Sequence, residues 1–415
     1  MKLQLKSHST IINAQLRLTG SKSETNRMLL LQALYPNIVL INTSNSDDSE
    51  VMLRALQFQN NDKPQIIDVH HAGTAMRFLT AFCAIQVGKE FVLTGSDRMQ
   101  QRPIKILVDA LLQLGAKIEY LNNIGYPPLK ITGTKLSASK VDLNANVSSQ
   151  YISALLLIAP KLKNGLTISL EGSITSLPYL KMTLALLSQI GIVTSFSKNV
   201  ISVNSSQTTS NLDPITIESD WSSASYWYSI AALSDIGTEI TLFNYKKNSL
   251  QGYAALAEIY EHFGVHTFFN DNESITLKKI KEHSTAILNI DLNNYPDIAQ
   301  TIAVTCFGLK TGCHLTGLET LKIKETDRLA ALDNELGKLG ATMKVTHDSL
   351  HLQPSDKIND GVTITTYQDH RMAMAFAPLA LKTNIIIDNA EVVSKSYPTF
   401  WNDLKSVGFD VDEVN

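Results

Sequence analysis

The most regular feature of the chain is a helix-like apolar run that ends in glycine and precedes a short alternating strand. It first appears at residues 111–115, before an alternating stretch at residues 117–120. The series of terminal glycines is Gly115, Gly191, Gly264, Gly340 and Gly408, spaced roughly 70 residues apart. Glycine after a helix supports the left-handed conformation that ends it. With a weaker copy near residue 56, the pattern predicts about six units that mix strands and helices.

These units predict an α/β (α+β) protein with two similar domains of three units each. A chain of 415 residues is too long for one ordinary core. We expect the chain to cross between domains at residues 20–21 and around residues 218–220. Residues 1–20 would then be the first strand of a discontinuous domain, residues 21–218 the other domain, and residues 219–415 the remainder of the discontinuous one.

Composition favours a globular enzyme or binding protein of the cytoplasm. Hydrophobic residues make up 44% and charged residues 18%, and the net charge of −3 gives no general reason to expect nucleic acid. The three cysteines lie in or beside apolar runs and fit no zinc spacing, which indicates buried thiols in a reducing compartment. The N-terminus has no signal-peptide core, and no apolar run reaches membrane-spanning length.

The stretch at residues 20–27 is the first candidate for ligand chemistry. It ends an alternating strand and opens an apolar helix, and Ser21 or Ser23 can cap that helix. Lys22 and Arg27 stand at the same helix start, where cations oppose the helix dipole, so the pattern suggests a bound phosphate or carboxylate. The alternative is a solvated basic turn.

Several other helix starts carry small polar and basic residues. The stretches are residues 72–77, where Thr74 could cap, 98–103, 148–150 and 369–371. Each alone could be an ordinary structural cap, but their repetition suggests helix starts that meet at one cleft.

Residues 322–328 are the most specific local stretch. Lys324 and Arg328 are four residues apart, which would place them on one helical face, and Glu325 could accept a proton between them. The alternative is a surface ladder of ion pairs. Asp297 could be an ordinary helix cap and Lys395 a solvated lysine, so both stay open on local grounds.

Eight cations stand beside these candidate turns: Lys22, Arg27, Arg77, Arg98, Lys324, Arg328, Arg371 and Lys395. Gathering them without a ligand would cost several kcal/mol of repulsion at an effective dielectric constant of about 20. We therefore expect strongly anionic ligands, and halves that stay apart until those ligands bind.

Together and in this order, the motifs at residues 21–27, 72–77, 148–150, 324–328 and 369–373 resemble those of the 5-enolpyruvylshikimate-3-phosphate synthases. The resemblance runs from residue 20 to about residue 398. It implies two domains of three βαβαββ units each, joined by a two-strand hinge. It also implies transfer of the enolpyruvyl group of phosphoenolpyruvate to the 5-hydroxyl of shikimate 3-phosphate, with release of phosphate through a tetrahedral intermediate. This step belongs to the biosynthesis of chorismate and aromatic amino acids.

The resemblance implies no metal or cofactor, and we expect a monomer that acts on two small molecules and binds neither nucleic acid nor membrane. At shikimate 3-phosphate it places Lys22, Ser23, Arg27, Ser148, Ser149, Gln150, Ser176, Tyr179, Asp297 and Lys324. At phosphoenolpyruvate it places Lys22, Gly73, Arg98, Gln150, Arg328, Arg371 and Lys395.

We hypothesise that Asp297 is the base toward the 5-hydroxyl and that Glu325 transfers protons at C3. Lys22 would assist protonation and, with Arg328, Arg371 and Lys395, stabilise the phosphate of the intermediate.

Four residues depart from the family pattern: His71, Phe78, Leu177 and Thr320. The first two bear on the shape of the phosphoenolpyruvate pocket, hence on glyphosate sensitivity, and the other two on contacts to the shikimate phosphate.

Two rival interpretations remain. The sister transferase acting on UDP-N-acetylglucosamine has asparagine after its first lysine and often a mobile-loop cysteine, whereas here Ser23 follows Lys22 and Cys83 lies in an apolar helix. A non-catalytic sugar-phosphate sensor would be expected to lack Asp297, Glu325 or Lys395, and all three are present.

Overall fold

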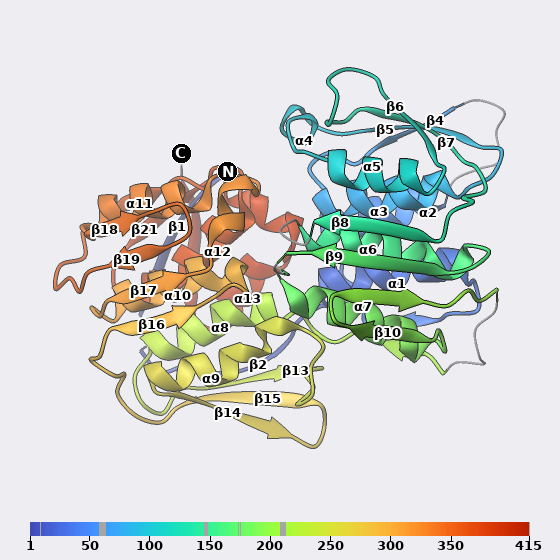
Figure 1. Cartoon of the computed structure of the whole chain (residues 1–415). Coiled ribbons are helices and arrows are strands. Elements are labelled where there is room, and N and C mark those ends of the chain that lie inside the picture. The colour runs from blue at the N-terminus through green and yellow to red at the C-terminus, as the bar shows by residue number, and fades with distance from the viewer. Residues whose placement is uncertain are drawn as a thin grey trace. The chain divides into compact units, whose positions relative to one another are not determined.

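The computed structural model describes residues 1–8, 10–57, 64–144, 148–172, 174, 176–207 and 213–414. The chain divides into two compact units (Figure 1). One, here the terminal unit, comprises Met1–Thr19 and Glu218–Asn415, and the other, here the inserted unit, is Gly20–Ile217. No helix in the described ranges has both the length and the apolar character to cross a bilayer.

The described strands form five four-stranded sheets and one two-stranded sheet, and the five share one strand order. In the sheet β4-β5-β7-β6, for example, β4 and β5 are parallel, and β7 pairs antiparallel with both β5 and β6. A helix joins the parallel strands and a second helix precedes the hairpin, because parallel neighbours need a crossover whereas antiparallel ones need only a turn. The predicted βαβαββ unit is therefore confirmed in the sheets that show it.

The inserted unit contains two such repeats and a third with fewer described strands. One repeat is β4 (Gln65–Asp68), α3 (Gly73–Ala84), β5 (Glu90–Thr94), α4 (Asp97–Gln100), α5 (Lys105–Gln113), β6 (Lys117–Tyr120) and β7 (Leu129–Thr132). The next is β8 (Lys140–Asn144), α6 (Ser149–Ile158), η1 (Ala159–Lys161), β9 (Leu166–Glu171), α7 (Leu177–Gln189), β10 (Thr194–Ser197) and β11 (Val200–Val203). The third has α1 (Lys22–Leu34), β3 (Leu40–Ile41), α2 (Asp47–Leu56) and β12 (Ile215–Thr216), with β3 and β12 parallel.

The terminal unit contains three repeats, each with a four-stranded sheet. The first has β2 (Asn13–Arg17), α8 (Trp221–Leu233), β13 (Glu239–Phe243), η2 (Gly252–Ala255), α9 (Leu256–Ile259), η3 (Tyr260–Phe263), β14 (Val265–Asn270) and β15 (Ser274–Lys279). The second has β16 (Leu288–Asp291), η4 (Pro296–Ile298), α10 (Ala299–Gly308), β17 (Cys313–Thr316), η5 (Glu319–Ile323), α11 (Arg328–Leu339), β18 (Met343–Val345) and β19 (Leu350–Leu352). The third has β20 (Val362–Ile364), α12 (His370–Phe376), η6 (Ala377–Leu381), β21 (Ile385–Asp388), η7 (Ala390–Lys395), α13 (Phe400–Ser406), β22 (Phe409–Val414) and β1 (Lys2–Ser7).

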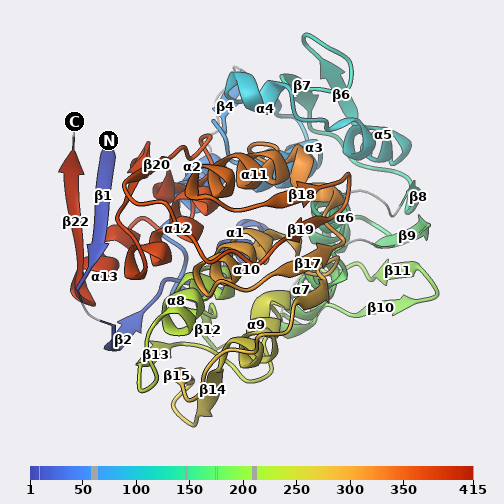
Figure 2. The same cartoon turned by 90° about the vertical axis from the view of Figure 1, so that its left-hand side faces the viewer.

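The two ends of the chain complete this last sheet. Strand β1 lies between β21 and β22, antiparallel to both, so the first and last strands of the chain are neighbours (Figure 2). The first strand of the chain thus belongs to the same unit as the last.

One helix from each repeat lies inside its unit. In the terminal unit α8, α10 and α12 pack on one another, and every residue of these three helices is buried. In the inserted unit α1, α3 and α6 pack together in the same way. A helix that is buried on all sides is surrounded by other elements, so the sheets and remaining helices form the outside of each unit.

The five glycines that ended the apolar runs all have positive φ angles, between +78° and +101°. Each stands where a helical segment gives way to a strand, so the predicted left-handed helix ends are confirmed. The boundaries between units lie after Thr19 and after Ile217.

Candidate active site

In the inserted unit, the start of α1 presents Lys22. Ser21 caps this helix by accepting a hydrogen bond from the backbone N–H of Glu24, as predicted. Lys22 Nζ lies 3.4 Å from a carboxylate oxygen of Asp48, in the first turn of α2. Sequence reasoning missed Asp48, although an acidic first turn after the Ser46 cap was a usable signal.

Arg27 is buried within the same unit rather than presented on its surface. Its guanidinium donates to the hydroxyls of Thr183 and Ser153 and to the backbone carbonyl of Ser23. It also lies over the ring of Tyr179, 5.6 Å from the centroid. Burial lowers the pKa of Arg27 to about 10. The side chain therefore ties α1 to α6 and α7, and direct contact with shikimate 3-phosphate stays a prediction.

The start of α3 differs from the prediction. Ala72, not Thr74, is the N-cap residue, and Thr74 lies inside the helix, where its hydroxyl accepts a hydrogen bond from Gln150 Nε2. Ser148 caps α6 and Ser149 begins it, so the bond from Gln150 joins the starts of α3 and α6. Ser176 precedes α7 in a left-handed conformation, with φ at +52°.

An arginine that sequence reasoning missed lies against Gly73. A Cβ atom built on Gly73 would come within 2.5 Å of the Arg102 guanidinium, so the absence of a side chain at Gly73 lets the guanidinium lie directly against the start of α3. The predicted Arg98 is instead exposed on α4, a short helix that the sequence pattern did not indicate. Pro103 lies just ahead of α5, which begins at Lys105, and the Arg-Pro pair before a helix start was the available signal.

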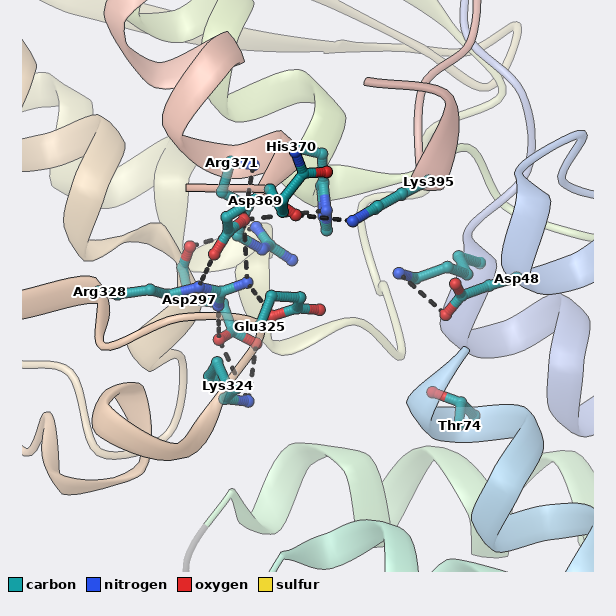
Figure 3. A network of polar contacts seen from close by, with 12 residues as sticks. Asp48, Thr74, Asp297, Lys324, Glu325, Arg328, Asp369, His370, Arg371 and Lys395 are labelled. Carbon is teal, nitrogen blue, oxygen red and sulfur yellow. Dashed lines mark hydrogen bonds and ion pairs between the residues drawn. The ribbon is translucent and has the colours of Figure 1, made fainter. Parts of the chain in front are cut away.

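In the terminal unit, Asp297 is the centre of a dense polar network (Figure 3). One of its carboxylate oxygens lies 2.7 Å from Arg328 NH1 and 3.2 Å from Lys324 Nζ. The other accepts a hydrogen bond of 2.9 Å from the hydroxyl of Tyr253. Arg371 donates to the backbone carbonyl of Asp297 and lies over the Tyr253 ring. Tyr253 carried no signal in its local sequence, because this contact joins segments 44 residues apart.

Arg328 holds three carboxylates at once. Besides Asp297, it binds Asp369 through Nε at 2.6 Å and Glu325 through NH2 at 2.7 Å. Its side chain is 2% exposed. The predicted helical face shared by Lys324 and Arg328 is wrong: Asp327 caps α11, which begins only at Arg328. Lys324 instead ends η5 in an extended conformation, from which it still reaches Asp297.

The start of α12 completes the network. Asp369 is fully buried and caps α12 by accepting a hydrogen bond from the backbone N–H of Arg371, as the sequence predicts. Lys395 ends η7, and its ammonium donates to the backbone carbonyl of Gln368 at 2.6 Å. The structure thus brings Asp297, Lys324, Glu325, Arg328 and Arg371 together, with Lys395 attached next to Asp369.

The electrostatics differ from the expected gathering of bare cations. Burial opposes ionisation of Asp297, but Lys324, Arg371 and Arg328 outweigh it and hold the pKa of Asp297 well below its ordinary value. Burial disfavours the charged form of Arg328 too, yet Asp369, Glu325 and Asp297 raise its pKa above the ordinary value. Carboxylates therefore separate the cations, and the repulsion counted from the sequence is largely offset within this network.

Of the four residues that depart from the family pattern, His71, Phe78 and Leu177 have ordinary surroundings. His71 lies 3.9 Å from Asp47, Phe78 is buried beneath Arg27, and Leu177 begins α7. The hydroxyl of Thr320 is buried with no hydrogen-bond partner among the described residues. The described part of the chain contains no group of three or more His, Cys, Asp or Glu side chains that could hold a metal ion.

The arrangement suits the recognition of anions next to proton-transferring carboxylates. Comparison with known proteins points the same way. Residues 57–404 match the family model described as EPSP synthase (3-phosphoshikimate 1-carboxyvinyltransferase). A 3-phosphoshikimate 1-carboxyvinyltransferase of Bacteroides fragilis strain YCH46 is 46% identical, with 96% of each chain covered. One of Colwellia psychrerythraea strain 34H is 37% identical, over 95% of this chain and 97% of that protein.

Solved structures support the fold. An EPSP synthase of Acinetobacter baumannii superposes with a TM-score of 0.78 at 21% identity, covering 99% of this chain and 100% of that one. The enolpyruvyl transferase NikO of Streptomyces tendae gives a TM-score of 0.74 at 14% identity, covering 100% of this chain and 98% of that one.

Proposed function

The chain belongs to the EPSP synthase family, and on that premise we propose which of its residues carry out the family's reaction. The activity is that of a 3-phosphoshikimate 1-carboxyvinyltransferase, which moves the enolpyruvyl group of phosphoenolpyruvate to shikimate 3-phosphate in the shikimate pathway. The residue roles below are supported chiefly by the network around Asp297.

Asp297 is proposed as the base that removes the proton of the 5-hydroxyl, whose oxygen attacks C2 of phosphoenolpyruvate. With its pKa held well below the ordinary value by three cations, the carboxylate is a weak base before substrates bind. The phosphate and carboxylate groups of the substrates carry negative charge, and binding them beside Lys324, Arg328 and Arg371 would offset those cations. The pKa of Asp297 would then rise toward a range useful for catalysis.

Glu325 is proposed to transfer the proton at C3, first giving it as the tetrahedral intermediate forms and then removing it as phosphate leaves. Its support is its position: it lies beside Arg328 and is 22% exposed, whereas Asp297 and Asp369 are more deeply buried. A proton-transferring group needs both a fixed position and access to the substrate. Glu325 has the first through its 2.7 Å contact with Arg328.

The cations are proposed to bind the phosphate and carboxylate groups. Lys22 would assist protonation and, with Arg371 and Lys395, stabilise the charge of the intermediate. Arg102 joins this set on structural grounds, because its guanidinium lies against Gly73 at the start of α3, where backbone N–H groups favour an anion. Arg328, held by three carboxylates, is proposed to orient Asp297 and Glu325 at least as much as it binds phosphoenolpyruvate.

The remaining residues assigned to shikimate 3-phosphate are proposed on family likeness. They are Ser23, Arg27, Ser148, Ser149, Gln150, Ser176, Tyr179 and Lys324, and their support is the agreement of the motifs with the family. We also propose a cytoplasmic monomer that acts on these two small molecules and uses no nucleic acid or membrane partner; the small net charge of −3 supports the absence of a nucleic-acid role.

Release of inorganic phosphate tests the proposal. It should require shikimate 3-phosphate and phosphoenolpyruvate together, and UDP-N-acetylglucosamine should not replace the first. E325Q should lower kcat by about 10²–10⁴-fold, the usual contribution of a general acid or base, with little change in KM. E319Q, at an exposed glutamate in η5 of the same unit, is the matched control. A change in KM alone for E325Q would assign Glu325 to binding, and phosphate release without shikimate 3-phosphate would contradict the proposal.

A further inference from the structure

A buried glutamate in the middle of α11 has no part in the chemistry described so far. Glu335 has no exposed surface, yet its carboxylate accepts hydrogen bonds from three different groups. They are the hydroxyl of Tyr367 at 2.7 Å, the backbone N–H of Thr365 at 2.9 Å and the ammonium of Lys338 at 2.7 and 2.8 Å. Two of these donors belong to one segment, residues 365–367, which ends three residues before His370, the first residue of α12.

That segment leads into a strained turn. Tyr367 and Gln368 both have positive φ angles, +53° and +58°, which residues other than glycine rarely adopt. Two such residues in succession persist only when surrounding contacts hold them, and such outliers gather at functional sites. The hydrogen bonds that Thr365 and Tyr367 donate to Glu335 are contacts of this kind.

The turn delivers two parts of the candidate site. The backbone carbonyl of Gln368 accepts the hydrogen bond from Lys395. The next residue, Asp369, accepts hydrogen bonds from Arg328 through both of its carboxylate oxygens. It also caps α12 by accepting a hydrogen bond from the backbone N–H of Arg371. A shift of the turn would therefore move the partners of Lys395, Arg328 and Arg371 together.

We propose that Glu335 is a positioning residue that fixes the turn at residues 365–369, and with it the placement of Lys395, Arg328 and Arg371. This inference rests on the function proposed above for those cations. Glu335 touches no reacting group itself, and acts through Tyr367 and the backbone of Thr365. A buried carboxylate costs desolvation free energy that an apolar residue in the same helix would not, and its cationic partner Lys338 is 42% exposed.

The test separates positioning from plain stability by removing different donors to the same carboxylate. Y367F removes the hydroxyl that binds Glu335 and keeps the ring. K338M removes the half-exposed ammonium, with its 3.3 Å contact to the Thr365 hydroxyl, and keeps the bonds that the Thr365 N–H and the Tyr367 hydroxyl donate to Glu335. Y367F should lower kcat/KM for phosphoenolpyruvate by about 10–100-fold, the scale of a misplaced catalytic group, and should lose more activity for each degree of Tm lost than K338M does. K338M should lower Tm while kcat/KM stays within about twofold, because the turn keeps both of its bonds to Glu335.

A rescue variant tests the role of backbone strain. The Gln368 side chain is exposed, and glycine adopts a positive φ without strain. The double variant Y367F/Q368G should have a kcat/KM at least about threefold higher than that of Y367F. The single variant Q368G is measured in parallel as the control for the glycine itself.

The inference is overturned if Y367F keeps wild-type kcat/KM, if Y367F and K338M lose activity in the same proportion to Tm, or if Q368G recovers nothing. A wild-type protein that releases no phosphate from the two substrates would instead contradict the proposed function.

Discussion

Replacing Arg328 with lysine should reveal how much the network depends on one guanidinium. The arginine reaches Asp297, Asp369 and Glu325 at 2.6–2.7 Å from three different nitrogens. A lysine ammonium keeps the charge, but it lacks the planar fork that can serve three carboxylates in fixed directions. Asp369 is fully buried, so losing its partner there leaves an unpaired charge away from water.

The size of the effect follows from the burial of the pairs. Removing one partner of a buried ion pair costs about 3–5 kcal/mol. For a unit of this size, 1 kcal/mol shifts Tm by about 2–4 °C, so that loss lowers Tm by about 6–20 °C. R17K, at the exposed arginine of β2 in the same unit, is the matched control and should change Tm by less than about 2 °C.

The pH dependence provides a second readout with a definite sign. In the native chain the pKa of Asp297 is held well below its ordinary value, with Arg328 among the causes. Ionised Asp297 therefore contributes stability above the ordinary aspartate pKa of about 3.9, and that stability is lost only as pH falls through the lowered value. In R328K the pKa of Asp297 should rise toward the ordinary value, so acid unfolding should begin at a higher pH than in the wild type.

Calorimetric unfolding from pH 3 to 8, with R17K in parallel, measures both effects. If R328K kept the wild-type Tm and the wild-type acid-unfolding midpoint, Arg328 would not be the residue that holds the three carboxylates, and the reasoning would fail.

Three further predictions address single residues. R102M should raise KM for phosphoenolpyruvate about 10–100-fold, as expected for loss of one charge-assisted contact, whereas R98M should change it by less than about threefold; equal effects in the two variants would remove Arg102 from the site. Y253F should lower kcat about tenfold, because the hydroxyl that holds one oxygen of Asp297 is gone, and an unchanged kcat in steady-state assays would show that this bond does not matter. Burial lowers the pKa of Lys279 to about 8, so the folded state binds fewer protons than the unfolded state between about pH 8 and 10.5. The free energy of unfolding of the wild type minus that of K279M should therefore grow as pH rises over this range. A constant or shrinking difference in denaturant titrations would contradict the assignment.

Much of the fold could be predicted because its signals are local. The glycines that end the helical segments need a backbone conformation that one residue determines, and all five have it. Ser21, Ser148 and Asp369 cap the helices that follow them, since a cap depends on a few neighbouring residues. The prediction failed at Thr74, because α3 starts at Gly73, one residue earlier than a Thr74 cap requires.

The site was predictable only in part. Spacing drew attention to Lys324, Glu325 and Arg328, yet it misplaced Lys324 on a helix because Asp327 starts that helix later. The partners that fix these residues come from other repeats: Asp369 meets Arg328 across 41 positions of chain. Tyr253 could not be found by any local pattern for the same reason.

Family likeness named candidate site residues that spacing alone did not single out. It named Lys395 and Gly73, whose local sequences are unremarkable, and it named Arg98, whereas the arginine that the structure places against Gly73 is Arg102. The contact between Arg102 and Gly73 depends on how the loop after α4 folds back, which neither spacing nor composition encodes.

The most direct test of the account is the turnover of D297N with shikimate 3-phosphate and phosphoenolpyruvate, followed as phosphate release. Asparagine keeps the shape of the side chain but cannot accept the 5-hydroxyl proton, so kcat should fall by about 10²–10⁴-fold while KM for each substrate changes little. Turnover by D297N at the wild-type rate would contradict the claim that the network around Asp297 performs the chemistry.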